Sequence, residues 1–472
     1  MTPWRGIRDA VTWGPIAPQT SPVPGFSLPG DPTHSDEDCL NLNVWTPRPD
    51  DRLRPVVVWV HGGGFTTGTG ASTLFAGHHL AAKGVVVVTI NYRLGALGLL
   101  AHPDMDGDGA GGWANWALHD QLAALGWVQD NIAAFGGDPG NVTLSGESAG
   151  AMSICDLLSV PAASSLFRRA VVQSGPPVAA GVDWAIGRSQ RLAGHLGLPA
   201  FSLEELRRAP AAQLVSATQR LAAEIPGDGG LPLPFLPVVD GGLLERFPDD
   251  SIVDGEAAAV PLLVGTTRDE SALFTVADWT KPELDMGRVV RRVARFVEPD
   301  AAAAVVEAYR DARAARGEPI SGHQLWTAIT TDYVFRLPLL SMLAAHRKYQ
   351  TKVFSYLFTW ESPFMGGAFG SCHGLEIPFV FGTVANRAIQ VFTGSGPSSA
   401  ALSEQMQSAW LAFARDDDPS CEEVGSWPAF DPIQRSTMVF GPGGGLYDDP
   451  RSQERLAWEE AGISIPVGHN HE

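Results

Sequence analysis

Ser148 lies in the sequence GESAG, residues 146–150, where its neighbours could make its hydroxyl a nucleophile. A short apolar run, residues 141–145, precedes this motif, and small and apolar residues follow it over 149–158. The pattern predicts a strand, a sharp turn and a helix, with glycines where the turn is strained and the helix passes close to the strand. At a helix N-terminus, backbone N–H groups and the helix dipole favour negative charge. This context predicts a nucleophile, whereas G-x-S-x-G alone is a weak signal in a chain with 52 glycines.

A second motif that could take part in catalysis is HGGGF, residues 61–65, which follows a buried-strand pattern at 55–60. Consecutive glycines at a strand end let the backbone approach a ligand with its N–H groups free. We expect the N–H groups of Gly63, Gly64 and Ala149 to bind the oxyanion of a tetrahedral intermediate. His61 is interpreted as a residue that packs or fixes the loop, not as a base.

These motifs require a parallel sheet to position them. Strand-like runs are expected at residues 40–46, 55–60, 84–91, 141–145, 170–173, 261–265 and 352–358. Helical patterns are expected at residues 118–131, 149–158, 183–196, 202–224 and 300–316. Alternating strands and helices indicate the α/β class, with a large, mostly parallel central sheet flanked by helices. Because no linker stands out, we expect a single domain over residues 1–472, with helical excursions at roughly 180–230 and 275–345.

A base should follow the nucleophile, because triads of the α/β-hydrolase fold run in the chain order Ser, acid, His. The histidines after Ser148 are His195, His323, His346, His373, His469 and His471. The first three lie in helical stretches and the last two in a polar tail. His373 alone lies in a short loop bounded by glycines, GSCHG at 370–374, after the strand pattern 352–358. We therefore predict that His373 is the base.

Three carboxylates compete for the role of the acid. Asp269 and Glu270 lie in the loop after the strand pattern 261–265, and Asp240 follows the apolar run 236–239. Folds of this kind place their chemistry at the carboxyl ends of strands. The spacing does not separate the three residues.

Composition excludes several classes of function. The chain has 52 acidic and 33 basic residues, a net charge of −19, which repels nucleic acid and anionic membranes. Apolar runs are too short for a membrane span, and the N-terminus lacks the apolar region of a signal peptide. Four cysteines without a CxxC motif indicate free thiols. We expect a cytoplasmic location, with secretion open if the natural N-terminus lies upstream.

Taken together, the motifs resemble those of the type-B carboxylesterase family, which is para-nitrobenzyl esterase- and cholinesterase-like. The resemblance spans nearly the whole chain. The matching stretches are EDCLNLNVWTP (37–47), HGGGF (61–65), NYRLGALGLL (91–100), DQLAALGWVQDNIAAFGGDPGNVTLSGESAGA (120–151), QSG (173–175), PVVDG (237–241), VGTTRDES (264–271), HGLEIPFVFG (373–382) and WLAFAR (410–415).

The resemblance implies an α/β-hydrolase fold in which helical insertions cap an active-site gorge. It implies a glutamate as the acid, which selects Glu270, and it makes Ser174 a partner of the triad. Members of the family usually carry further N-terminal residues, so either the natural N-terminus lies upstream or an edge of the fold is lost. In secreted members the equivalent of Cys39 pairs with an upstream cysteine that this sequence lacks, which implies a free thiol.

We therefore predict a serine carboxylesterase that hydrolyses small, mainly uncharged esters through an acyl-enzyme, with no metal and no organic cofactor. A lipase- or amidase-like serine hydrolase of the same fold is the alternative. A neuroligin-like binding protein without catalysis is disfavoured, because Ser, Glu and His are all present. Five aromatic residues could line a gorge or lie in the core: Phe274, Trp326, Phe335, Phe364 and Phe369.

Overall fold

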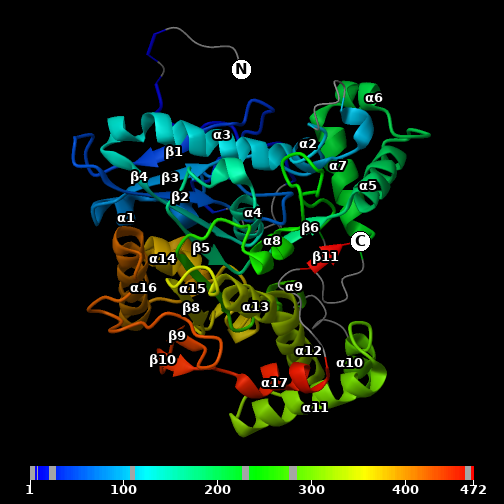
Figure 1. Cartoon of the computed structure of the whole chain (residues 1–472), viewed down its shortest axis with the longest axis vertical. Coiled ribbons are helices and arrows are strands. Elements are labelled where there is room, and N and C mark those ends of the chain that lie inside the picture. The colour runs from blue at the N-terminus through cyan, green and yellow to red at the C-terminus, as the bar shows by residue number, and fades with distance from the viewer. Residues whose placement is uncertain are drawn as a thin grey trace.

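The computed structural model describes residues 6–7, 9–20, 28–106, 112–225, 233–275, 284–462 and 469–471. A nine-stranded sheet crosses the molecule in the order β1-β3-β2-β4-β5-β7-β8-β9-β10 (Figure 1). The edge strands β1 and β10 are antiparallel to their neighbours, and the strands between them are parallel. The strands of this sheet are β1 (Leu42–Trp45), β2 (Arg54–Val60), β3 (Val86–Ile90), β4 (Gly137–Glu147), β5 (Arg169–Gln173), β7 (Leu262–Thr267), β8 (Val353–Phe358), β9 (Ser436–Phe440) and β10 (Gly445–Asp448). A separate pair joins β6 (Val178–Ala180) and β11 (His469–His471).

The central strands are apolar along their whole length because both faces of the sheet are covered. In β3, Val86 and Val88 belong to one hydrophobic core, while Val87 belongs to a second core on the opposite face. Such two-sided burial is typical of parallel strands. The expected α/β-hydrolase architecture, a mostly parallel sheet flanked by helices, is confirmed.

Helices cover both faces of this sheet. One core includes residues of α3, α4, α8 and α13, and the other includes residues of α1, α14 and α16. The helices are α1 (His78–Ala82), α2 (Ala96–Leu99), α3 (Trp116–Asn131), α4 (Ala149–Leu158), α5 (Val182–His195), α6 (Leu203–Arg208), α7 (Ala211–Ala223), α8 (Pro248–Asp254), α9 (Ala272–Thr275), α10 (Met286–Val293), α11 (Pro299–Ala315), α12 (Gly322–Thr331), α13 (Leu337–His346), α14 (Ile377–Phe381), α15 (Arg387–Thr393), α16 (Pro397–Asp416) and α17 (Ser452–Glu460). Over the described ranges, no helix has both the length and the apolar character needed to cross a bilayer.

Two groups of helices extend beyond the layers that cover the sheet. Helices α5, α6 and α7 form one group, and α10, α11 and α12 lie beside α17 at the lower end of the view in Figure 1. The second group has its own hydrophobic cluster, which includes Val305, Trp326 and Trp458. Whether these groups cap a gorge within a single domain stays a prediction.

The helix expected over residues 202–224 is two helices, α6 and α7. The break falls at Ala209 and Pro210, where Ala209 has an extended conformation with ψ 130°. Proline disfavours helical geometry in the residue before it and has no N–H to donate. The continuous helical pattern missed this local restriction.

Arg169 joins the strand that leads to the nucleophile to the long helix α16. Its guanidinium is fully buried and binds the carboxylate of Asp417 at 2.6 Å, Asn141 Oδ1 at 2.7 Å and the Ala414 carbonyl at 2.6 Å. Arg168 binds the same carboxylate from a side chain that is 54% exposed. Burying a guanidinium is costly unless its donors are satisfied, so this network fixes β4, β5 and the end of α16 together.

We predict that Arg169→Ala lowers the free energy of unfolding by about 3–5 kcal/mol, because it removes one partner of a buried pair. Arg168→Ala is the matched control and should cost less than about 1 kcal/mol, because its charge is exposed to solvent. Urea denaturation measures both variants. Equal losses for the two would contradict a special role for the buried arginine.

Candidate active site

Ser148 lies at a strained turn between β4 and α4. Its backbone has φ 55° and ψ −126°, a conformation that is unusual for a residue other than glycine. Its N–H donates to the carbonyl of Gln173 on β5 at 2.9 Å. A Cβ at Gly146 would lie 2.8 Å from the Val60 carbonyl, so only glycine fits between β4 and β2. The GESAG motif is therefore folded as a strand–turn–helix element that raises the serine above the sheet.

The glycine loop at 62–64 lies directly against this turn. A Cβ at Gly62 would come within 2.9 Å of the Ser148 Cβ, so the loop backbone packs on the serine. Gly63 and Gly64 have φ 111° and 59°, which glycine adopts readily. Ala149 is the first residue of α4, where a helix leaves its N–H groups without intrahelical partners. Thus the three amides that the sequence predicts as oxyanion donors belong to two segments that meet at Ser148.

The imidazole of His61 is buried and packs against Tyr92. The two rings stack with centroids 4.4 Å apart, while the Tyr92 hydroxyl donates to the His61 carbonyl at 2.8 Å. Burial lowers the pKa of His61 to about 4, which keeps the imidazole neutral. This agrees with its interpretation as a packing residue.

Among the candidate acids, Glu270 is the carboxylate that contacts His373. Nδ1 of His373 lies 2.6 Å from Oε2 of Glu270. The other carboxylate oxygen of Glu270 accepts from the Ser174 hydroxyl at 2.5 Å and from the Thr267 N–H at 2.7 Å. These bonds fix the carboxylate in a buried position, where it orients the imidazole.

The other two candidate acids have different partners. Asp240 accepts from the side chain of Asn115 at 3.0 Å and from the N–H groups of its own turn. Asp269 accepts from the N–H of Ser371 in the loop that carries His373. Spacing in the sequence could not separate these roles because all three residues follow apolar runs that resemble strands.

Two further glutamates surround the imidazole, and the sequence reasoning missed both. Glu147, the residue before the nucleophile, places Oε1 3.0 Å from Nε2 of His373. Glu376 accepts from the Gln173 side chain at 3.0 Å, and both glutamates are buried. The available signals were a charged residue inside GESAG and a glutamate three residues after His373.

This cluster places several buried carboxyl groups around one imidazole. Burial lowers the pKa of His373, but the negative charges of Glu147 and Glu270 outweigh burial and the net shift is upward. Burial raises the pKa of Glu147, and the charge of His373 opposes that shift. For Glu376, burial and then the charge of Glu147 raise the pKa. A proton is therefore favoured on the imidazole of His373 over a wider pH range than usual.

Ser148 and His373 are not hydrogen-bonded in this structure, where Nε2 of His373 has no hydrogen-bond partner among the described residues. Both side chains are buried, at 8% and 7% exposure. Catalytic hydrogen bonds are often loose without substrate and tighten in the complex. The imidazole nitrogen that faces away from Glu270 lies 3.0 Å from Oε1 of Glu147, without the geometry of a hydrogen bond.

Two of the five candidate aromatic residues contact the imidazole. The rings of Phe274 and Phe335 lie 5.3 Å and 5.1 Å from that of His373, centroid to centroid, and stack on each other. Phe335 lies in a π-helical turn, Asp332–Arg336, and such turns are frequent at functional sites. Phe274 is 40% exposed and Phe335 is buried.

The remaining three candidate aromatic residues pack elsewhere. Trp326 stacks on Phe296 in the cluster of α10–α12. Phe364 and Phe369 pack on each other with ring centroids 5.5 Å apart.

Over the described residues, no group of three or more His, Cys, Asp or Glu side chains is arranged to hold a metal ion.

Comparison with known proteins shows that the chain is similar to carboxylic ester hydrolases. The model of the carboxylesterase family matches residues 1–455. The chain is 36% identical to para-nitrobenzyl esterase of Bacillus subtilis (strain 168) over 466 residues, 96% of this chain and 88% of that protein. It is 37% identical to phenmedipham hydrolase of Pseudarthrobacter oxydans over 455 residues, 93% of this chain and 87% of that protein. A solved structure of a PNB esterase superposes with a TM-score of 0.84 at 34% identity, covering 96% of this chain and 90% of that one.

We predict that Glu147→Gln moves the acid limb of the kcat/KM profile to lower pH by about one unit, because an opposite charge near a histidine raises its pKa. The imidazole must be neutral to accept a proton, so activity is lost as the pH falls through that pKa. Removing the Glu147 charge lowers the pKa and extends activity toward acid.

Glu376→Gln provides a graded comparison and should shift the limb less, because Glu376 contributes least among the carboxylates that raise the His373 pKa. The measurement is kcat/KM for a para-nitrophenyl ester between roughly pH 5 and 10, which covers the raised pKa of His373. An unchanged or alkaline-shifted limb in Glu147→Gln would count against the electrostatic account.

Proposed function

The chain belongs to the carboxylesterase family, and on that premise we propose that it is a serine carboxylesterase with Ser148 as its nucleophile. In this proposal it hydrolyses small, mainly uncharged carboxylic esters through an acyl-enzyme. The observation that carries the proposal is the 2.6 Å contact that orients His373 on Glu270 near a serine in a strained strand–helix turn. Relatives named as esterases support the reaction class.

In the first half of the reaction, Nε2 of His373 removes the proton from the Ser148 hydroxyl as its oxygen attacks the ester carbonyl. Glu270 holds Nδ1 and stabilises the imidazolium that forms. The carbonyl oxygen gains negative charge, which the N–H groups of Gly63, Gly64 and Ala149 bind. Each such donor typically contributes about 3–4 kcal/mol to transition-state stabilisation.

In the second half, the tetrahedral intermediate collapses and the alcohol leaves with the proton from His373. Water then gives a proton to the same imidazole and attacks the acyl-enzyme. Collapse of the second intermediate releases the acid and returns the proton to Ser148. The protein groups that act in these steps are the side chains of Ser148, Glu270 and His373 and the three backbone amides.

The surroundings of His373 support an apolar substrate portion. Phe274 is partly exposed beside the imidazole, so it offers an aromatic wall to a group bound at the serine. The net charge of −19 favours neutral or cationic substrates over anionic ones. Both features agree with small, uncharged esters.

We propose in addition a cytoplasmic location, which the cysteines support. Cys39, Cys155, Cys372 and Cys421 are all free thiols, and the first three are buried. Disulfides are rare in reducing compartments, where thiols persist.

We predict that Ser148→Ala lowers kcat for a para-nitrophenyl ester by at least about 10⁴-fold with the fold intact, because the nucleophile is lost. Steady-state kinetics with circular dichroism as a folding control measures this. A matched set of para-nitrophenyl esters and anilides then separates rivals: preference for long acyl chains indicates a lipase, and anilide turnover indicates an amidase. Wild-type protein without turnover on any ester would indicate a non-catalytic, neuroligin-like protein.

We also predict that Phe274→Ala widens the substrate range. Removal of the ring should raise kcat/KM for a bulky acyl ester relative to the acetate by about 10-fold, a size typical of hydrophobic pocket discrimination. Phe364→Ala, which removes an equal ring from a different aromatic cluster, should leave that ratio unchanged. If both variants behave alike, Phe274 does not shape the substrate pocket.

A further inference from the structure

We propose that Asp269 is a positioning residue that sets the distance between the acid loop, residues 268–271, and the base loop, residues 370–374. It does so through a pair of hydrogen bonds with Ser371, named here the 269–371 bridge. The inference rests on the proposed function, because it concerns how the acid Glu270 meets the base His373.

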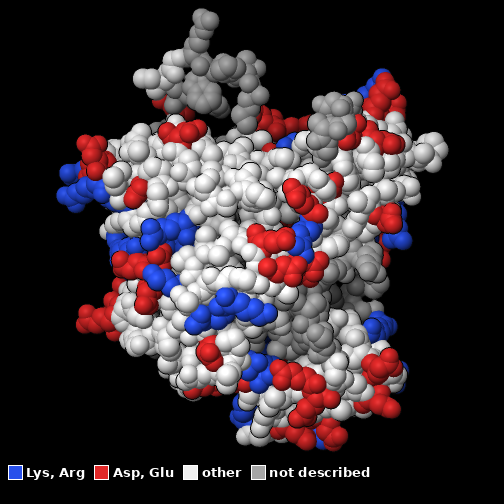
Figure 2. All heavy atoms as spheres, viewed as in Figure 1, with Lys and Arg blue, Asp and Glu red and all other residues white. Residues whose placement is uncertain are grey.

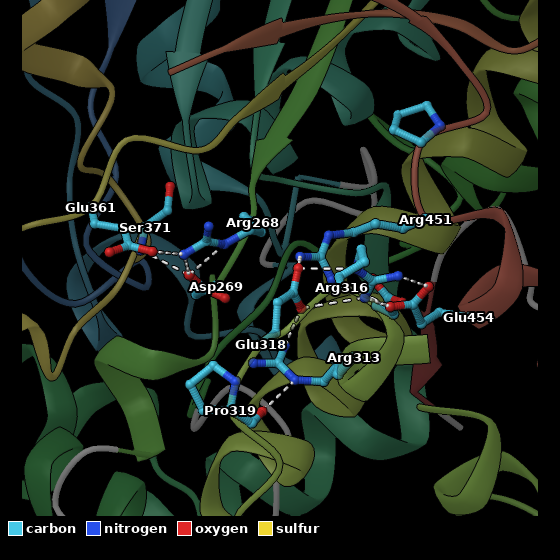
Figure 3. A network of polar contacts seen from close by, with 12 residues as sticks. Arg268, Asp269, Arg313, Arg316, Glu318, Pro319, Glu361, Ser371, Arg451 and Glu454 are labelled. Carbon is cyan, nitrogen blue, oxygen red and sulfur yellow. Dashed lines mark hydrogen bonds and ion pairs between the residues drawn. The ribbon is translucent and has the colours of Figure 1, made fainter. Parts of the chain in front are cut away.

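The 269–371 bridge is reciprocal. Oδ2 of Asp269 accepts from the N–H of Ser371 at 2.9 Å, and the N–H of Asp269 donates to the Ser371 carbonyl at 2.9 Å. Figure 3 shows Asp269 between Arg268 and Ser371, with its carboxylate directed at both. One bond ends on the Asp269 side chain and the other joins the two backbones, so together they fix both the separation and the orientation of the loops.

The base loop is shaped around the carboxylate of Asp269. Gly370 has φ 52°, and a Cβ there would lie 2.5 Å from Oδ2 of Asp269. Ser371 is fully buried, and its hydroxyl donates to the Phe358 carbonyl at 2.9 Å. The N–H of Arg268 donates to that same carbonyl at 2.8 Å. Both loops are thus anchored at the end of β8, and the Asp269 carboxylate fills the space between them.

The bridge lies next to the catalytic contact in the chain. Glu270 follows Asp269 directly, and His373 is two residues after Ser371. Consecutive Cα atoms are about 3.8 Å apart, so the bridge is tethered to the acid by one step and to the base by two. A change in the bridge must therefore move the imidazole relative to the Glu270 carboxylate.

The ion pair between Asp269 and Arg268 does not by itself explain how the acid loop and the base loop are held together. Arg268 binds Oδ2 of Asp269 at 2.7 Å and also binds Glu361 at 2.7 Å. Because Arg268 and Asp269 are adjacent in the chain, their pair cannot join two loops. Two side chains of the acid loop, residues 268–271, bond to the base loop, residues 370–374. Glu270 bonds to His373, and Asp269 bonds to the N–H of Ser371.

Figure 3 also shows a second set of ion pairs, between the end of α11 and α17. Its members are Arg313, Arg316, Glu318, Arg451 and Glu454. Arg313 lies close enough for its charge to interact with Asp269.

The test compares Asp269→Ala, Asp269→Asn and Glu361→Gln in the full chain. Asp269→Ala leaves the buried N–H of Ser371 without its acceptor, and a displacement near 1 Å in such a site costs about 10²-fold in rate. We expect kcat to fall about 30- to 100-fold with KM within about threefold, the pattern of an interaction used in the transition state. Asp269→Asn keeps an oxygen for Ser371 and should recover most of the rate, and Glu361→Gln should match the wild type.

A second readout separates positioning from a loss of stability. The charged groups that face the imidazole are Glu147, Glu270 and Glu376. A loosened Glu270 contact stabilises the imidazolium less, so Asp269→Ala should move the acid limb of kcat/KM to lower pH, while Glu361→Gln should not. Rates are expressed per active site, counted from the burst of para-nitrophenol.

The outcomes are distinguishable from those of the nucleophile test. If Ser148→Ala abolishes turnover while Asp269→Ala keeps the wild-type kcat and pH profile per active site, the positioning role is wrong and the proposed function stands. If Ser148→Ala retains turnover, the proposed function itself fails. A kcat loss in Asp269→Ala that Asp269→Asn does not recover, with the pH profile unchanged, would also overturn the role of the bridge.

Discussion

The contact between the imidazole of His373 and the carboxylate of Glu270 constrains much of this structure. The two residues are 103 positions apart in the chain, yet Nδ1 and Oε2 lie 2.6 Å from each other. They meet because β7 and β8 are parallel neighbours whose carboxyl ends open at the same edge of the sheet. The separation of Nδ1 and Oε2 depends on the order of the strands, on the anchoring of both loops at the end of β8 and on the other bonds to Glu270.

Electrostatics at this contact involve more than a pair. Taking carboxylates out of water is costly unless hydrogen bonds or opposite charges compensate. Glu270 is compensated by contacts with Ser174, Thr267 and His373. Glu147 and Glu376 lie in the same buried cluster, and burial raises the pKa of both. The acidic character of the molecular surface, visible as scattered red groups in Figure 2, is a separate matter from this buried cluster. The buried carboxylates raise the pKa of His373.

Close backbone packing gives the site its shape. Glycines at 62, 146 and 370 each occupy positions where a Cβ would meet a neighbouring atom within 3 Å. The first two bring β2 and β4 together at Ser148, and the third brings the base loop onto Asp269. The amides of the predicted oxyanion hole, the nucleophile turn and the base loop can therefore pack closely only because side chains are absent where the backbones meet.

The sequence by itself determined the fold class, the turn that carries Ser148 and the loop that carries His373, because apolar periodicity and glycine placement are local properties. Local pattern did not show β9 and β10, or the break at Pro210 within a helical run. It also left Asp240, Asp269 and Glu270 equivalent, and the choice of Glu270 came from family resemblance. Tertiary structure decided what each carboxylate faces: Glu270 and Glu147 face His373, while Asp269 faces Ser371. These are contacts between distant segments, and only the pairing of strands into one sheet brings those segments together.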